Sequence, residues 1–395
     1  MLRMKMLRKC RRNVFMFLII IFIYIFFFFT RWNIIHKPIS DTEFNSVGVN
    51  EYHNKGRSGH FTSVPAGRQS KINVILIASW RSGSSFTGQL FNMHQDIFYL
   101  FEPLRFLGQE KVKQDETTEV LEAMYKCDFE NSLLSEWIKQ TNIDVLHRVS
   151  SNALIELCPK EITQGADPGP CTRRIYKQCP DLTPENVTHA CKKYPYKFFK
   201  VIKLTDIKFL EEVVVKHNVK IIHLVRDPRG IHFSRQNSYD VRYTVNNNLF
   251  GMYWTCRHVS EIVNLTDRGT KWLQGNYKRI RFEDLSMQPL QTSIQIYDFL
   301  KIPFTGKIKQ WIVENTMKKN QTKTTKKKCN HKLNKKSSDV AHAWRLNSNL
   351  TTVLEIQNIC TQAMQSLGYL KVNTEQELRD ISLPVMLSRT EMEVQ

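Results

Sequence analysis

Short, mostly apolar runs, each ended by a polar turn, are the feature that most restricts how this 395-residue chain can fold. The first run spans residues 73–78, and comparable runs cover 198–204 and 220–225. A strand has this form when both of its faces are covered, which occurs mainly in parallel sheets. We therefore expect these three segments to be strands of a buried sheet.

Helical patterns alternate with these strands. A Ser/Gly-rich turn and a helix over about 84–93 follow the first strand, and a helix over 206–217, with Asp206 near its N-cap, precedes the third. Pro228 suits the first turn of a further helix. A last strand is expected at 278–282, with a helix after it. This alternation predicts an α/β domain with a mostly parallel central sheet.

A membrane anchor is predicted near the N-terminus. Residues 14–29 are sixteen apolar residues without a charge, close to the lower limit of about 17 residues for a spanning helix. Six basic residues precede this run and only Arg31 closely follows it. The positive-inside rule therefore places the N-terminus in the cytosol and the rest of the chain in the lumen. A cleaved signal peptide is the alternative, but no small-x-small cleavage site follows the run.

These segments define the expected domain organisation. It comprises a cytosolic tail at 1–13, a transmembrane anchor at 14–30, a polar stem at 31–70, a single α/β domain at 71–372 and a C-terminal tail at 373–395.

Eight cysteines follow the predicted anchor, and an even number in an oxidising compartment favours disulfides. Cys158, Cys171, Cys179 and Cys191 lie close together among prolines, as in a loop stapled by disulfides. A zinc site is the alternative, but the C-x2-C pairs typical of such a site are absent. The sequence does not choose the pairing.

Four N-x-S/T sequons agree with a lumenal domain, and they begin at Asn186, Asn264, Asn320 and Asn349. The formal net charge of +20 favours a polyanionic partner or a membrane surface. Nine of the lysines lie between residues 318 and 336, as a solvated loop or as a surface for an acidic glycan. A lumenal location argues against nucleic acid as the partner.

The turn after the first strand carries the strongest chemical signal. It reads Trp80-Arg-Ser-Gly-Ser-Ser-Phe86. A strand-to-helix turn of this kind directs several backbone N–H groups and the positive end of the helix dipole to one point. Three serine hydroxyls and the permanent charge of Arg81 complete a predicted anion site. The lysine and spacing of a nucleoside-triphosphatase loop are absent, and an ordinary β–α turn is the structural alternative.

A second basic segment, Arg226-Asp-Pro-Arg-Gly-Ile-His-Phe-Ser234, starts at the end of the third strand. Ligands of open α/β sheets bind outside the carboxyl ends of the strands, so Arg226 and Ser234 can meet at another phosphate. Two anion sites at neighbouring strand ends suit a ligand with two phosphate groups. The structural alternative pairs Arg226 with Asp227 or another nearby carboxylate.

With these motifs the chain resembles the Golgi carbohydrate sulfotransferases. Within them it is similar to the galactose/N-acetylgalactosamine/N-acetylglucosamine 6-O-sulfotransferase family, which includes keratan sulfate and chondroitin 6-O enzymes. The first segment resembles the family's 5′-phosphosulfate-binding loop, and the second its 3′-phosphate-binding segment. The likeness continues through Phe101-Glu-Pro-Leu104, Arg281-Phe-Glu-Asp-Leu285, and the stretch from Trp344-Arg345 to Leu367-Gly-Tyr369, so it covers about residues 72–370.

The resemblance implies a P-loop-like sulfotransferase domain. Its reaction is transfer of a sulfonate group from 3′-phosphoadenylyl sulfate (PAPS), without a metal, to a hydroxyl of a glycan or glycosaminoglycan. The implied donor-binding residues are Trp80, Arg81, Ser82, Gly83, Ser84, Ser85, Phe86, Arg226, Asp227, Pro228, Arg229, Gly230, Ile231, His232, Phe233 and Ser234. Arg81 also has the catalytic role of stabilising charge on the bridging oxygen, although many cytosolic sulfotransferases have Lys at this position. The resemblance further implies a type II location in the Golgi membrane.

Two other functions are compatible with the anchor and the compartment. One is a Golgi glycan-binding protein that keeps the same fold without turnover. The other is a lumenal glycosyltransferase, but the D-x-D metal site of most such enzymes is absent.

The acceptor hydroxyl needs a base, and Glu102 is our candidate. It follows the first β–α unit in an apolar setting, which suits a carboxylate that accepts a proton. The alternative is a structural ion pair with Arg105. His94 and His232 are weaker candidates.

Three other titratable residues are predicted to be structural. His223 lies inside a buried strand and is expected to be a core residue. Glu283 and Asp284 are expected to cap the helix that follows the last strand.

Overall fold

The computed structural model describes residues 72–107, 114–141, 145–164, 173–202, 204, 206–238, 249–316, 337–388 and 391. The chain divides into two compact units, Met1–Pro65 and Ala66–Gln395, and every described residue belongs to the second. No helix within the described ranges is long and apolar enough to cross a membrane. The predicted cytosolic tail, anchor and stem at 1–70 lie outside these ranges.

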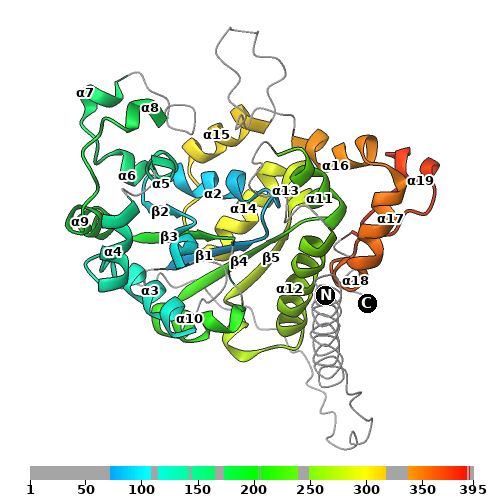
Figure 1. The fold of residues 1–395 in the computed structure, drawn as a ribbon, viewed down its shortest axis with the longest axis horizontal. Helices are drawn as coiled ribbons and strands as arrows, with labels where there is room; N and C mark the ends of the chain where they lie inside the picture. Colours follow the sequence, from blue (N-terminus) through cyan, green and yellow to red (C-terminus); the bar gives the residue numbers. More distant parts are fainter. Residues whose placement is uncertain are drawn as a thin grey trace, which may run out of the picture. The chain divides into compact units, whose positions relative to one another are not determined.

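Five parallel strands form one sheet in the order β2-β3-β1-β4-β5 (Figure 1). They are β1 (Asn73–Ala78), β2 (Ile97–Phe101), β3 (Tyr196–Val201), β4 (Val219–Val225) and β5 (Tyr277–Arg281). The four strands expected from the sequence are confirmed, with small shifts at their ends, and so is the α/β class. The sequence pattern does not predict β2, which is followed by the short 3-10 helix η1 (Pro103–Leu107) instead of the α-helix typical of a β–α unit.

The central strand β1 is the point at which the strand order switches. Ile77 of β1 pairs with Val201 of β3 on one side, and Ala78 pairs with Leu224 of β4 on the other. The turns after β1 and β4 therefore leave the sheet beside each other. A switch point of this kind is where open α/β sheets bind ligands.

Helices cover both faces of the sheet, and alternate residues of β1 point to opposite faces. On one face Ile75 and Ile77 belong to the larger apolar cluster. The helices of that cluster include α3 (Gln114–Lys126), α4 (Ser132–Thr141), α6 (Asn152–Ile155), α9 (Pro184–Lys193) and α10 (Glu211–His217). On the other face Val74 and Leu76 pack with a second set. These helices are α2 (Ser84–Asn92), α13 (Phe282–Met287), α14 (Pro289–Leu300) and α15 (Gly306–Thr316).

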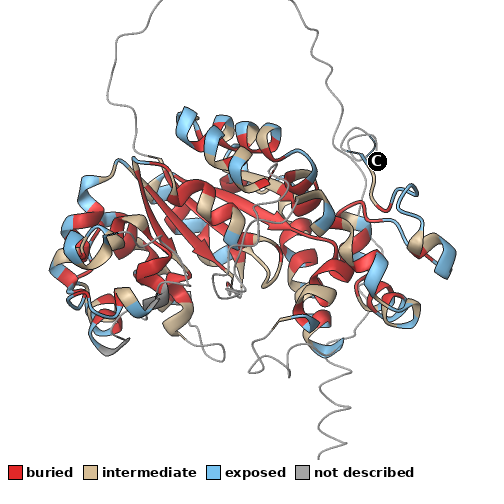
Figure 2. Ribbon diagram, turned by 90° about the horizontal axis from the view of Figure 1, so that it is seen from above, coloured by how far each residue is buried: buried red, intermediate tan, exposed pale blue. Residues whose placement is uncertain are grey.

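A further group of helices packs beside the end of β4. It consists of α11 (Pro228–Gln236), α12 (Leu249–Asp267), α16 (Ser337–Asn347), α17 (Leu350–Ile359), α18 (Thr361–Ser366) and α19 (Glu375–Arg379). Short helices complete the described part of the chain: α5 (Val145–Val149), α7 (Lys160–Thr163), α8 (Arg173–Tyr176), η3 (Ile207–Leu210) and η5 (Lys271–Leu273). Figure 2 shows the strands and the inner sides of these helices buried, with exposed residues on the outer sides.

The predicted helices after β1 and β3 are confirmed. The first is α2, and the second consists of η3 followed by α10. The Asp206 side chain accepts a hydrogen bond of 2.9 Å from the Lys208 N–H and so caps η3. Pro228 lies in the first turn of α11, as expected of a residue without a backbone donor.

The C-terminal residues pack onto the domain. Arg345 of α16 is fully buried, and its guanidinium donates to backbone carbonyls between Glu377 and Leu383. Val372 and Leu378 are fully buried in the same cluster. The packed structure therefore continues past residue 372, where the sequence predicts a tail.

Three disulfides join cysteines of the described residues: Cys127–Cys191, Cys158–Cys179 and Cys256–Cys360. They confirm that the cysteines form disulfides. Cys158–Cys179 staples the proline-rich segment, whereas Cys191 pairs outside it. Cys171 and Cys329 lie outside the described residues.

Three of the predicted sequons lie within the described residues. Asn349 is exposed and is the N-cap of α17. Asn186 and Asn264 are half-buried on α9 and α12, and Asn320 lies outside the described ranges.

Removing the Cys256–Cys360 disulfide should lower the free energy of unfolding by about 2–4 kcal/mol. This link closes a long loop and so reduces the conformational entropy of the unfolded chain. The double variant Cys256→Ala/Cys360→Ala tests this by urea denaturation. The matched variant Cys158→Ala/Cys179→Ala removes a link across 21 residues instead of 104. Its loss should be smaller by about 1 kcal/mol, and a larger loss would contradict the argument.

Candidate functional site

The turn between β1 and α2 leaves several hydrogen-bond donors without a partner among the described residues. No side chain caps α2, so the N–H groups of Ser84 and Ser85 are open to a ligand, whereas the Phe86 N–H donates to the Gly83 carbonyl at 3.1 Å. The hydroxyls of Ser84 and Ser85 form no hydrogen bond to any described residue. Ser82 differs, because its buried hydroxyl donates to the Ser79 carbonyl at 2.7 Å and holds the turn together.

Glycine is required at position 83 for two reasons. Gly83 has a φ of +95°, which L side chains rarely adopt. A Cβ added there would lie 2.3 Å from the ring of Phe282, which belongs to α13. Phe86 anchors the other end of the turn, with its ring centroid 5.4 Å from that of Trp311 on α15.

The second basic segment contacts this turn directly. Arg226, which follows β4, donates from Nη1 to the Arg81 carbonyl at 2.9 Å and from Nη2 to the Val340 carbonyl at 3.3 Å. Its guanidinium lies 4.1 Å from the centroid of the Phe282 ring. Arg81 donates from Nε to the Ser234 hydroxyl at 3.0 Å. The two predicted anion-binding segments therefore form one site.

Neither Arg81 nor Arg226 forms an ion pair with a carboxylate of the described residues. Burial lowers the pKa of both guanidinium groups, and the charge of Arg81 adds to this effect at Arg226. The negative charges of Glu283 and Asp227 raise the pKa of Arg226 and so oppose the effect of burial. Buried cations are unfavourable without an anionic partner. A phosphate or sulfate group between the two arginines would supply it.

Asp227 and Arg229 are engaged with each other. Arg229 Nη2 lies 2.7 Å from the Asp227 carboxylate, and both side chains are buried. Arg229 also donates to Gln357 Oε1 at 2.8 Å, and its guanidinium lies 4.4 Å from the Trp344 ring. The interpretation that pairs Arg226 with Asp227 is therefore wrong, because Arg229 is the ion-pair partner of that carboxylate.

The other residues of the second segment support the site from within the fold. Gly230 leaves space for Arg226, since a Cβ there would lie 3.2 Å from the Arg226 Nε. Ile231 and Phe233 pack into apolar clusters, and His232 is buried. Within this segment, Arg226 and Ser234 are the residues that the structure joins to the first turn.

Glu283 supports the turn after β4 instead of capping α13. Its carboxylate accepts the Asp227 N–H at 3.1 Å and the Tyr369 hydroxyl at 2.8 Å. Burial, with a smaller contribution from Asp227, raises the pKa of Glu283. Asp284 pairs with Arg281 at 3.2 Å, and α13 has no side-chain cap. The predicted capping role is therefore wrong for both carboxylates.

The candidate base Glu102 follows β2 with a φ of +49°. Its Oε1 accepts a hydrogen bond of 2.8 Å from Lys200 Nζ. The partner is thus a lysine of β3, and not Arg105 as the structural alternative proposes. Glu102 also lines a small pocket, and the other residues of its wall are Leu104, Arg105, Val201 and Ile202.

The histidines are less suited to act as a base. Both ring nitrogens of His94 lie within hydrogen-bond distance of backbone groups, the Pro303 carbonyl at 3.0 Å and the Asp96 N–H at 3.1 Å. His223 is fully buried and lies 2.6 Å from the Tyr277 hydroxyl. Burial lowers the pKa of His223 to about 3, so it is the core residue that the sequence predicts.

Arg235 is a supporting residue that the sequence analysis missed. It lies one position beyond the predicted segment, and its Nε and Nη2 both lie 3.3 Å from the Trp80 carbonyl. Nη2 also donates to the Thr255 hydroxyl at 3.1 Å, and the guanidinium lies 5.4 Å from the Trp80 ring. Burial lowers the pKa of Arg235 to about 10. Arg235 therefore connects the turn between β1 and α2 to helix α12.

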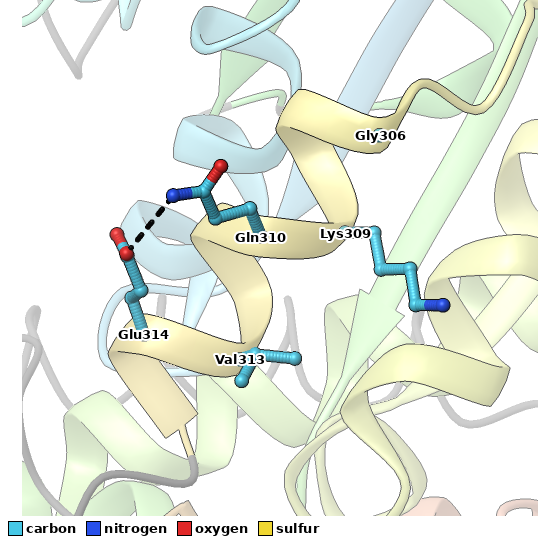
Figure 3. Close-up of a pocket in the computed structure, with 5 residues that line it drawn as sticks. All are labelled: Gly306, Lys309, Gln310, Val313 and Glu314. Carbon is cyan, nitrogen blue, oxygen red and sulfur yellow. Dashed lines mark hydrogen bonds between the residues drawn. The ribbon is translucent and has the colours of Figure 1, made fainter.

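A surface hollow along α15 does not have the features of an active site. It is lined by Gly306, Lys309, Gln310, Val313 and Glu314. Figure 3 shows Gln310 turned toward Glu314, to which it donates a hydrogen bond of 3.2 Å, while Lys309 points away from both. These side chains do not converge on a common point, in contrast to those at the ends of β1 and β4.

Known proteins resemble this chain over most of its length. A family model described as a sulfotransferase domain matches residues 71–368. The chain is 30% identical over 354 residues to mouse carbohydrate sulfotransferase 1, covering 81% of this chain and 84% of that protein. It is 28% identical over 350 residues to carbohydrate sulfotransferase 3 of Tetronarce californica, covering 81% and 78%. The crystal structure of mouse sulfotransferase SULT7A1 complexed with PAP matches with a TM-score of 0.37 and 12% identity, over 79% of this chain and 89% of that one.

Gly83→Ala should weaken binding of adenosine 3′,5′-bisphosphate about tenfold or more, because the new methyl group displaces either the turn or Phe282. Isothermal titration calorimetry measures the dissociation constant. Gly275→Ala is the matched control, since Gly275 has a φ of +68° but no atom within 4 Å of the added Cβ. Equal binding by the two variants would show that the contact with Phe282 is unimportant.

Proposed function

The chain belongs to the carbohydrate sulfotransferases, and from this membership we propose that it uses PAPS to sulfate the 6-hydroxyl of galactose, N-acetylgalactosamine or N-acetylglucosamine in a glycan. The enzyme class and the carbohydrate acceptor follow from the family. We propose the PAPS donor, the 6-position of the acceptor and the roles of the site residues.

One observation carries the proposal: the two arginines at adjacent strand ends have no carboxylate partner among the described residues. A donor with a phosphosulfate at one end and a 3′-phosphate at the other provides anions for both. Gly83, the open N–H groups of α2 and the hydroxyls of Ser84 and Ser85 fit the phosphosulfate end. Arg226 and Ser234 fit the 3′-phosphate.

Sulfonate transfer requires positioning and charge neutralisation, as phosphoryl transfer does. In our proposal the acceptor oxygen forms a bond to sulfur, and the hydroxyl proton passes to Glu102. The bond from sulfur to the bridging oxygen breaks, and its electron pair leaves with adenosine 3′,5′-bisphosphate. Arg81 and the N–H groups of the turn stabilise the charge that develops on this leaving group.

The 6-position is favoured by the size of the space beside Glu102. The pocket there measures about 10 Å³, room for roughly one water-sized group and far below the roughly 300–1,000 Å³ of pockets that enclose a whole small molecule. A hydroxyl on the exocyclic carbon of a hexose can enter such a space without the ring. The positive net charge of the chain is compatible with an acceptor that already carries acidic groups.

We further propose a single-pass type II location in the Golgi membrane, with the catalytic domain in the lumen. The apolar run at 14–29 and the basic residues before it support this orientation. The disulfides also support it, because they persist in the secretory pathway and are rare in the cytosol.

Arg81→Ala should lower kcat/KM for sulfonate transfer about 10²- to 10³-fold, the usual effect of removing a group that stabilises developing charge. The full chain in detergent is incubated with radiolabelled PAPS and galactose- or hexosamine-terminated oligosaccharides, and linkage analysis locates the sulfate. Arg257→Ala is the matched control, because it removes an exposed arginine paired with Glu261. Transfer to a ring hydroxyl would refute the 6-position, and donor binding without any transfer would refute the mechanism.

Asn349→Gln should remove one N-linked glycan from the chain expressed in mammalian cells, because Asn349 is exposed and begins a sequon. The shift is measured by gel mobility before and after peptide N-glycosidase treatment. Asn347→Gln is the control, since Asn347 is exposed but outside any sequon. A chain without any glycan, whose C-terminus is accessible from the cytosol, would contradict the lumenal location.

A further inference from the structure

The buried ion pair between Glu102 and Lys200 joins the ends of two neighbouring strands. Lys200 Nζ lies 2.8 Å from Glu102 Oε1, and the side chains are 1% and 11% exposed. The Glu102 backbone N–H also donates to the Lys200 carbonyl at 2.9 Å. Both the backbone and the side chain of Glu102 are therefore fixed to β3.

The backbone of Glu102 has an unusual conformation that makes this pairing possible. In a regular strand, Glu102 would point to the face opposite to that of Phe101. Its φ of +49° ends this alternation. Lys200 Nζ lies 3.8 Å from the Phe101 ring centroid, so lysine, ring and carboxylate meet at one place. Strained backbone of this kind is typical of functional sites.

The two oxygens of Glu102 have different environments. Oε1 is occupied by Lys200, whereas Oε2 forms no hydrogen bond to any described residue. Lys200 does not line the pocket beside Glu102, and its side chain is almost fully enclosed. Burial lowers the pKa of Lys200, and the carboxylate opposes this effect. A buried lysine in this position can hold the carboxylate but cannot reach a substrate in the pocket.

We propose that Lys200 is a positioning residue, which holds the carboxylate of Glu102 oriented so that Oε2 receives the proton of the acceptor hydroxyl. This inference rests on the proposed function. In this proposal Lys200 acts on the base Glu102, and it does not bind the donor, which Arg81 and Arg226 would hold. Lys200 should therefore influence the rate of transfer only through Glu102.

A double-mutant cycle tests this assignment with the full chain and an oligosaccharide acceptor. Lys200→Met and Glu102→Gln should each lower kcat about 10²-fold or more, and the double variant should be no more than about threefold slower than Glu102→Gln alone. The KM for PAPS should change less than about twofold in every variant, because none of the changed groups binds the donor. The double variant also replaces both charges, so it avoids the unpaired buried charge that could unfold a single variant.

Lys197→Met is the matched control, because Lys197 is a buried lysine of the same strand that donates to the Tyr194 carbonyl. Its kcat should remain within about threefold of wild type. Binding of adenosine 3′,5′-bisphosphate, measured by calorimetry, verifies that each variant is folded. Additive losses in the cycle, or a raised KM for PAPS in Lys200→Met, would refute the inference and assign Lys200 to the donor. An inactive wild-type protein would instead refute the proposed function.

Discussion

The pairing of β1 with β4 is the interaction on which the rest of the site depends. Its parallel register places Ala78 beside Leu224, so the turns that follow these strands emerge at the same edge of the sheet. One turn contributes open N–H groups and Arg81, and the other contributes Arg226. The hydrogen bond from Arg226 to the Arg81 carbonyl joins them. A single β–α turn with open donors is common, whereas such a turn beside a second one, with an arginine on each, is suited to a ligand with two anionic groups.

Three basic residues of this edge are held in ion pairs, which distinguishes them from Arg81 and Arg226. The paired ones are Arg229 with Asp227, Arg281 with Asp284 and Lys200 with Glu102. Arg81 and Arg226 contact neutral carbonyl and hydroxyl oxygens among the described residues. A bound phosphate would add direct charge attraction and bidentate hydrogen bonds, so it would stabilise both arginines more than these neutral oxygens do.

The sequence predicts the parts of this protein that depend on local pattern. Four of the strands and the helices after β1 and β3 follow from apolar runs, turn residues and caps, and the anion-binding turn follows from its glycine and serines. The contacts that support the site cannot be predicted from local pattern. Lys200 lies 98 residues from Glu102, Arg235 lies 155 residues from Trp80, and Tyr369 lies 86 residues from Glu283. Such pairs are created by the strand order, which no short pattern encodes, and this is why Glu283 is misassigned as a helix cap.

The strand order also links the position of the proposed base to the kind of hydroxyl that we propose as the acceptor. Glu102 follows β2, and β3 lies between β2 and β1. Neighbouring strands are about 4.8 Å apart, so the ends of β2 and β1 are separated by about 10 Å. A sulfonate held at the turn and a hydroxyl held at Glu102 must share this gap. A hydroxyl on an exocyclic carbon takes up less of this space than a hydroxyl on the sugar ring. Lys200 restricts the space further, because it fixes the carboxylate of Glu102 to β3. In the proposed function, the fixed base and the preference for a primary hydroxyl are thus two consequences of placing β3 between β2 and β1.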